Sequence, residues 1–164
     1  MRNRILLTLL IALVTFGALS TQAEPAHAQF RIGPHGGMAL EGETLFLGAD
    51  AWFGLYRINE LISIHANPGL SYYLLEGDAS RFTVDLDAQF LLEVSDSIAP
   101  YAGPGLSIAR ANAGDSEATD VDVTVTGGAL FLHTDQIQPF AEIRVRGLTE
   151  TPAFEIAAGA LFRF

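Results

Sequence analysis

The sequence predicts an all-β fold, in which eight antiparallel strands close up-and-down into a transmembrane β-barrel after a cleaved N-terminal signal peptide. Three observations lead to this prediction. The chain opens with an export-type leader. Its remainder alternates apolar and polar residues in eight segments. The aromatic residues of the apolar face lie at the ends of those segments.

Residues 1–28 have the three parts of a secretory signal peptide. Arg2 and Arg4 form a basic start, ILLTLLIALVTFGAL forms an apolar centre, and AHA before Gln29 is a small-x-small cleavage motif. The apolar run is shorter than the roughly 20 residues that a membrane-spanning helix needs. We therefore expect residues 1–28 to be removed on export and residues 29–164 to form one barrel domain.

After the leader, the dominant pattern is an alternation with period two, which is typical of β-strands. In RFTVDLDAQFLLE, the apolar side chains from Phe82 to Leu92 fall on one face, whereas Asp85 and Asp87 fall on the other. Each segment is long enough to cross a bilayer as a tilted strand, which takes about 9–11 residues. The eight expected strands cover 30–40, 45–55, 62–73, 81–92, 98–110, 120–132, 137–147 and 153–164.

Six positions on the apolar face of each segment carry no charge, and the aromatic residues of that face lie near its ends. A soluble barrel would turn the apolar face inward, whereas a membrane barrel turns it toward lipid and keeps the polar face in its lumen. Two aromatic girdles around an aliphatic band are typical of the membrane case. The expected girdle residues are Phe30, Phe53, Tyr72, Phe82, Phe90, Phe131 and Phe154, together with Phe162 and Phe164 of the last segment.

The polar face predicts a lumen filled by side chains, because an eight-stranded barrel is only wide enough to hold them. Carboxylates and arginines that meet in such a lumen would form a packed ionic network and not the lining of a channel. Their pairing would offset the cost of removing charges from water. The expected members of this network are Arg31, Asp50, Asp85, Asp87, Glu142, Arg144, Arg146, Glu155 and Arg163.

Two local features lead to further expectations. Pro34, Pro68 and Pro104 fall inside expected strands, where a residue without an N–H group interrupts the ladder, so we expect bulges or kinks there. The longest outer connection is the polar stretch ANAGDSEATD at 111–120, which we expect to be a loop.

With these features, the chain resembles the small eight-stranded outer-membrane barrels of the opacity-type and OmpA/OmpX-like proteins. The resemblance is most specific in the terminal AAGALFRF, where Gly159, Phe162 and Phe164 match the closing-strand signal of that family. Ala157 stands where that signal usually has a polar residue. The segment starts APYAGPG and QPFAEIRV, in which an aromatic residue follows a proline, are similar to the family as well.

The resemblance implies an integral protein of the outer membrane of a double-membraned bacterium, exported through the periplasm, with both termini on the periplasmic side. The expected partners are outer-membrane lipid, lipopolysaccharide and, during insertion, the barrel-assembly machinery, and we expect a monomer. The net charge of −10 argues against nucleic acid, which requires a basic surface. The chain has no cysteine, and we expect no cofactor and no metal site.

The function that follows from these features is non-enzymatic: a structural or passive barrel with a side-chain-filled polar lumen. Two alternatives remain open, a narrow porin or transport barrel for small hydrophobic solutes and a soluble periplasmic ligand-binding barrel. Some eight-stranded outer-membrane proteins are enzymes that act on lipid A with Ser, His and an acid. Here Ser63, His65 and Asp50 share the inward face, but a lumen would keep them from acyl chains, so we expect no catalysis.

Overall fold

The computed structural model describes residues 30–77, 79–114, 116–132, 136–148 and 152–164. The predicted signal peptide, residues 1–28, lies outside these ranges. Within them, no helix combines the length and the hydropathy that are needed to cross a membrane.

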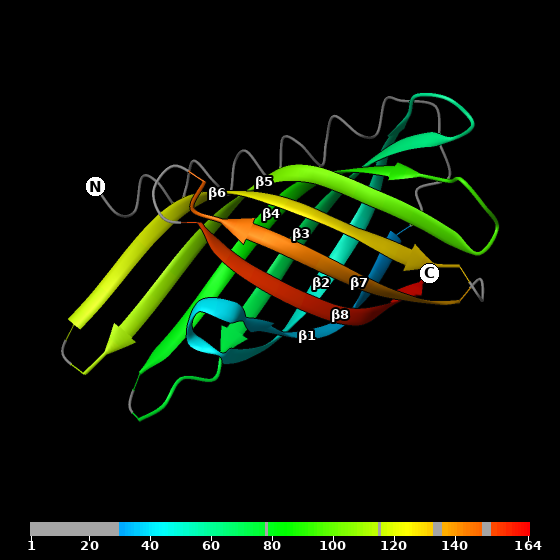
Figure 1. Cartoon of the computed structure of the whole chain (residues 1–164). Coiled ribbons are helices and arrows are strands. Elements are labelled where there is room, and N and C mark those ends of the chain that lie inside the picture. The colour runs from blue at the N-terminus through cyan, green and yellow to red at the C-terminus, as the bar shows by residue number, and fades with distance from the viewer. Residues whose placement is uncertain (1–29, 78, 115, 133–135, 149–151) are drawn as a thin grey trace.

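Eight strands follow one another in sequence order around a closed antiparallel barrel (Figure 1). The last strand pairs with the first, from Arg31↔Arg163 to Ala39↔Glu155, and this pairing completes the ring. The predicted fold class is therefore confirmed. The strands are β1 (Phe30–Ala39), β2 (Thr44–Arg57), β3 (Ile62–Tyr73), β4 (Ser80–Leu92), β5 (Ile98–Ala113), β6 (Ser116–Phe131), β7 (Ile137–Arg146) and β8 (Ala153–Arg163), and a short 3-10 turn, η1 (Leu40–Gly42), follows β1.

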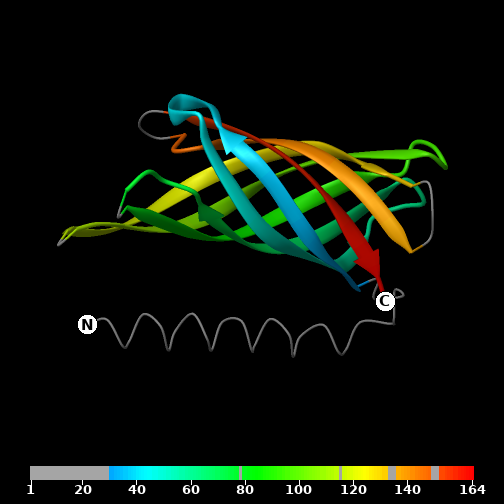
Figure 2. The ribbon, with the colours of Figure 1, turned by 90° about the horizontal axis from the view of Figure 1, so that it is seen from below.

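The start of β1 and the end of β8 lie at the same end of the barrel, which we call the terminal end (Figure 2). The β2–β3, β4–β5 and β6–β7 connections lie at this end, because each strand reverses the direction of the one before it. The opposite end, which carries the β1–β2, β3–β4 and β5–β6 hairpins, is the far end.

The alternation along each strand places one row of side chains inside the barrel and the next row outside. In β4, Asp85, Asp87 and Gln89 are 1%, 1% and 0% exposed, whereas Leu86 and Phe90, at the alternate positions, are 48% and 41% exposed. The apolar face therefore covers the outside and the polar face fills the lumen. This is the arrangement of a membrane barrel and the reverse of a soluble one.

Aromatic side chains form two bands on this outer surface, separated by leucine, isoleucine and valine. Large apolar groups between the bands, such as Leu86 and Ile143, are 48% and 56% exposed, as is expected of side chains that contact lipid. The band at the terminal end includes Phe30, Phe53, Phe90, Phe131, Phe162 and Phe164, and the band at the far end includes Tyr72, Phe82 and Phe154.

The terminal band continues across the seam between β8 and β1. The ring of Phe30 lies 5.0 Å from that of Phe53 and 6.1 Å from that of Phe164, measured between centroids. The backbone N–H of Phe164 also donates to the carbonyl of Phe30 over 3.1 Å. The last residue of the chain therefore takes part in closing the barrel.

Of the bulges or kinks predicted at the prolines, no bulge is found. Register is continuous through Pro34, Pro68 and Pro104 on one side of each strand. On the other side, a short stretch of pairing drops out between β1 and β8, β2 and β3, and β4 and β5, and then resumes in the same register. A proline lacks the N–H group for one ladder hydrogen bond, and the hydrogen bonds on both sides of it keep the strands in register. Among the described pairings, register shifts only between Gly54 and Tyr56.

The prediction of a loop at 111–120 is wrong. β5 and β6 are 16 residues long each and remain paired to Ala113↔Ser116, with Gly114 in the left-handed conformation at the turn (φ 58°). This hairpin extends past the other hairpins of the far end (Figure 1). Beyond the lipid both faces of a strand meet water, so the apolar alternation that marks the other strands is lost there.

Candidate functional site

The lumen is the candidate site, and it is filled in two layers. The layer nearer the terminal end is an apolar plug that holds the largest inward side chains of six strands. Its members pack on one another and are 0–3% exposed: Trp52, Leu91, Ala99, Tyr101, Leu130, Phe140 and Leu161.

Two glycines make room for the aromatic rings of the plug. A Cβ atom on Gly128 would lie 2.7 Å from the ring of Tyr101, and one on Gly159 would lie 2.6 Å from the ring of Phe140. Each glycine sits opposite its aromatic residue on the neighbouring strand. Tyr101 and Phe140 therefore lie flat against the wall, and no other residue type at the two glycine positions would leave that space.

The second layer is an ionic network built around two arginines of β7. Arg144 contacts Asp85 and Asp87 of β4, with Nη1 2.8 Å from Asp85 Oδ2 and Nη2 2.9 Å from Asp87 Oδ2. Its Nη2 lies 3.4 Å from Glu142, and its Nε donates to the hydroxyl of Thr126 on β6 over 3.1 Å. One guanidinium thus connects β4, β6 and β7 across the lumen.

Arg146 extends the network toward the far end. Its Nη1 lies 2.6 Å from Asp85 Oδ1 and also donates to the hydroxyl of Ser107. Its Nε lies 2.8 Å from Glu155 Oε2 on β8, close enough for an ion pair, although the N–H is not aimed at that oxygen. Tyr73 of β3 donates to the other oxygen of Glu155 over 2.5 Å.

Neutral hydroxyl groups supply the remaining donors to the carboxylates. Tyr101 donates to Glu142 over 2.9 Å, and Thr124 and Thr126 donate to the two oxygens of Asp87 over 3.2 and 3.3 Å. Hydrogen bonds of this kind offset the cost of burying carboxylates away from water. The two arginines and these hydroxyls together hold the four carboxylates of the network, which are Asp85, Asp87, Glu142 and Glu155.

A separate chain of hydrogen bonds joins Asp50 to His35 and Ser71. Asp50 Oδ2 lies 2.6 Å from His35 Nδ1, and His35 Nε2 lies 3.0 Å from Ser71 Oγ. Asp50, Ser63 and His65 are all buried on the inward face, as predicted, but Asp50 does not contact the other two. Those two contact each other over 3.0 Å, but the carboxylate pairs with the histidine of β1. The alternation along β1 and β3 also places His35 and Ser71 on the inward face, so the sequence could have indicated them as candidate partners of Asp50.

The structure divides the predicted network residues into three groups. Asp85, Asp87, Glu142, Arg144, Arg146 and Glu155 lie together, and Asp50 lies beside His35. Arg31 and Arg163 were wrongly placed in this network, because they lie at the terminal end near the apolar plug. Arg31 is buried and Arg163 is exposed at the rim. The alternation assigns both residues to the inward face of their strands, but it does not show how far along the barrel axis each side chain lies.

The three residues of the predicted insertion signal all lie on β8 or directly after it. Gly159 faces the lumen under Phe140, whereas Phe162 and Phe164 face outward in the terminal band. Gly159 thus has a packing role within the folded barrel. Among the described residues, no group of three or more His, Cys, Asp or Glu side chains is arranged to hold a metal ion.

No protein-family model matches the chain, and no curated protein sequence does so either. Solved structures do match. The N-terminal β-barrel domain of Pseudomonas aeruginosa OprF has a TM-score of 0.66 and 15% identity over 84% of this chain and 98% of that one. For Ail, the attachment invasion locus protein of Yersinia pestis, the TM-score is 0.60 at 15% identity, covering 84% and 97%. For the outer membrane enzyme PagL, the TM-score is 0.58 at 11% identity, covering 82% and 99%.

These similarities, together with the lipid-type exterior, define the class of the protein. Its fold is that of the small eight-stranded outer-membrane β-barrels. The structures that share this fold include an enzyme and an attachment protein, so the fold leaves the particular role open.

Proposed function

We propose that the protein is a non-enzymatic integral barrel of the outer membrane, with a passive, structural role and a lumen that does not conduct. One observation carries this proposal. Inward side chains at successive depths, such as Leu130 in the plug and Gln89, Thr124 and Thr126 beyond it, are 0% exposed to water. A continuous water-filled path would have to pass them and would leave some of their surface accessible.

The walls support the same proposal. All eight strand pairs around the barrel are joined by backbone pairing, and the stretches that drop out beside the prolines are short. A lateral path for hydrophobic solutes would need an opening between two strands. Because unpaired backbone groups are costly within lipid, an opening of that kind is disfavoured.

Single-channel recording tests the proposal. The refolded barrel is added to a planar lipid bilayer under a steady voltage, and micelles without protein serve as the control. We expect no steady ohmic steps above the control. Reproducible steps of one amplitude would show that the lumen opens, and would favour the porin alternative.

A second candidate function, serine hydrolysis, is favoured by the Ser71–His35–Asp50 chain, whose order and spacing match an activated serine. The burial of these groups weighs against it, because Ser71 is only 2% exposed and faces the filled lumen. Labelling with a fluorophosphonate probe distinguishes the two functions. We expect no labelling of the wild type, whereas labelling that is lost in Ser71→Ala would establish a reactive serine.

A further inference from the structure

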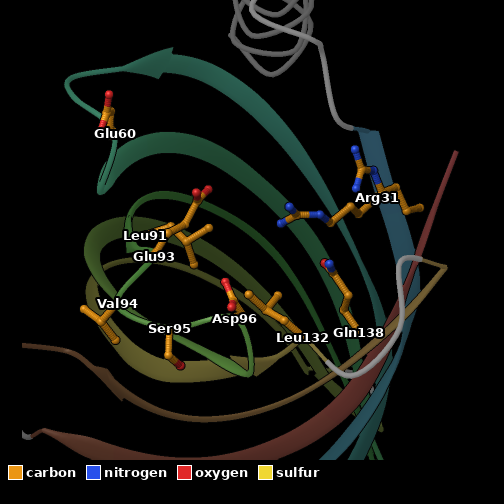
Figure 3. A pocket seen from close by; sticks show the side chains of 10 residues that line it. Arg31, Glu60, Leu91, Glu93, Val94, Ser95, Asp96, Leu132 and Gln138 are labelled. Carbon is orange, nitrogen blue, oxygen red and sulfur yellow. The ribbon is translucent and has the colours of Figure 1, made fainter.

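A cavity of about 540 Å³ opens at the terminal end of the barrel, outside the apolar plug (Figure 3). Leu91 and Leu132 form an apolar part of its lining, and Leu91 belongs to the plug. The volume falls within the roughly 300–1,000 Å³ of small-molecule sites. Neither the ionic network nor the proposed passive role makes use of this cavity.

One wall of the cavity is basic. Arg31 of β1 and Arg163 of β8 line it and are directly opposite each other in the strand register. Like charges in facing positions repel, and an anion close to both guanidinium groups would offset that repulsion. Beside them lies Gln138, which is 5% exposed and whose Oε1 has no hydrogen-bond partner among the described residues. A buried, unsatisfied amide oxygen in a cavity wall is a position where a ligand donor would be favoured.

The opposite wall is acidic. Glu60 of the β2–β3 turn and Glu93 and Asp96 of the β4–β5 turn line it, across the cavity from Arg31 and Gln138 (Figure 3). Glu93 forms an exposed ion pair with Arg57 over 2.7 Å, which partly neutralises that carboxylate. Glu60 and Asp96 therefore provide the negative side of the cavity.

We propose that this cavity binds a short peptide with a free carboxylate and a free ammonium group. A guanidinium group carries parallel N–H donors that match a carboxylate, and Arg31 and Arg163 would supply them. Gln138 accepts a hydrogen bond from a peptide N–H, the carboxylates of Glu60 and Asp96 attract the ammonium group, and the leucines accommodate an aliphatic side chain. A simple anion would use only the basic wall and would be repelled by the acidic one.

Nuclear magnetic resonance of the whole barrel in micelles tests this proposal with alanyl-leucine as the probe. The chain has one tryptophan, so its indole N–H gives a single signal. Trp52 is paired in register with Arg31 and packs in the same plug as Leu91, so this signal lies beside the cavity. We expect a saturable shift with a dissociation constant of about 1 mM, which is ordinary for a ligand of this size.

Three variants of the protein and two modified dipeptides identify the groups involved. Arg163→Gln and the C-terminal amide of the dipeptide should each weaken binding about tenfold, since each removes a charge-assisted contact. Arg110→Gln, at the far end, should leave binding unchanged. Asp96 lies in the β4–β5 turn. Asp96→Asn should weaken binding of alanyl-leucine but not of its N-acetyl form, which has no ammonium group.

Two results would overturn the proposal. One is the absence of a saturable shift up to the solubility of the dipeptide. The other is binding of acetate or inorganic phosphate as tight as that of the dipeptide, which would reduce the cavity to a general anion site. Neither result depends on whether the lumen conducts, so the passive role of the barrel is tested separately.

Discussion

Among single residues, Arg144 has the most consequences for the barrel, because its guanidinium contacts carboxylates from β4 and β7 and a hydroxyl from β6. All of these groups are buried. A buried ion pair adds little net stability compared with apolar packing, but the loss of one partner leaves the others charged and unpaired. The network therefore makes the lumen specific to this arrangement of strands.

Replacing Arg144 with methionine keeps much of the side-chain volume and removes the charge. We expect the free energy of unfolding to fall by about 3–5 kcal/mol, because Asp85 and Asp87 lose their common partner. Chemical denaturation of the barrel in micelles measures this change.

The matched control is Arg110→Met. Arg110 pairs with Glu117 over 2.8 Å, but both side chains are about half exposed, at 57% and 50%. An exposed pair of this kind contributes about 0–1 kcal/mol. Equal losses in the two variants would contradict the account of Arg144, because the buried network would then have no special role.

The sequence predicted which residues face inward but not which of them meet. The alternation along each strand assigned Asp50, Arg31 and Arg163 to the inward face; Asp50 and Arg31 are buried there, whereas Arg163 is exposed at the rim. The depth of each residue depends on the stagger of neighbouring strands, which a single strand does not reveal. Stagger places His35 beside Asp50, and it places Arg31 and Arg163 at the terminal end, on the far side of the plug from the carboxylates.

At the scale of strands, the fit between glycines and aromatic rings decides how closely neighbours approach. Gly128 of β6 and Tyr101 of β5 are paired in register, and the ring occupies the space above the glycine. The next residue, Gly127, faces outward, and a Cβ atom there would lie 3.9 Å from the carbonyl oxygen of Tyr101, an ordinary van der Waals contact. Two adjacent glycines on one strand therefore have different roles.

Gly128→Ala should destabilise the barrel by about 1–3 kcal/mol, the usual range for overpacking, because the added methyl group meets the Tyr101 ring. Gly127→Ala should change stability by no more than about 0.5 kcal/mol, as is usual for surface substitutions. Heat-induced unfolding followed on gels ranks the two variants. A larger loss in Gly127→Ala would mean that the ring does not rest on Gly128.

The outward face of a strand is sensitive to depth in the membrane. Leu86 and Leu92 are both outward on β4, but Leu86 lies midway between Phe82 and Phe90, whereas Leu92 lies past the terminal band. We expect Leu86→Arg to cost about 2–4 kcal/mol and Leu92→Arg about 0–1 kcal/mol. Folding into lipid vesicles under a denaturant series measures both costs, and equal costs would show that the lipid band has been assigned to the wrong depth.

The sequence predicted the strands where one face lies against lipid. It did not predict the parts of β5 and β6 that extend outside the lipid band. The alternation in β4 is complete because every second residue from Phe82 to Phe90 lies on the outer face within the lipid band. At 111–120 both faces of the β5–β6 hairpin are outside that band, so the polar composition suggested a loop although the backbone stays paired. At the prolines the sequence suggested bulges that are absent. The missing N–H group removes a short stretch of pairing on one side of the strand, and the register does not shift.

For the whole molecule, the central claim is a closed barrel with lipid outside and a filled polar lumen inside. Closure depends on β8, which pairs with β1. The next residue, Phe164, donates a backbone hydrogen bond to the carbonyl of Phe30. The eight-stranded membrane barrel could be predicted from the sequence because charge, alternation and aromatic position all pointed to the same arrangement. The cavity at the terminal end could not, since it is built from turns and strand ends that are distant in sequence.

The most direct test of this claim is gel migration of the outer-membrane fraction, boiled and unboiled, for the wild type and for a chain without Phe164. A closed barrel with its backbone groups paired resists SDS until it is heated. We predict that the wild type is found in the outer membrane and shifts on boiling, and that the shifted fraction falls when Phe164 is removed. A protein that is recovered in the soluble periplasm and does not shift would contradict the account.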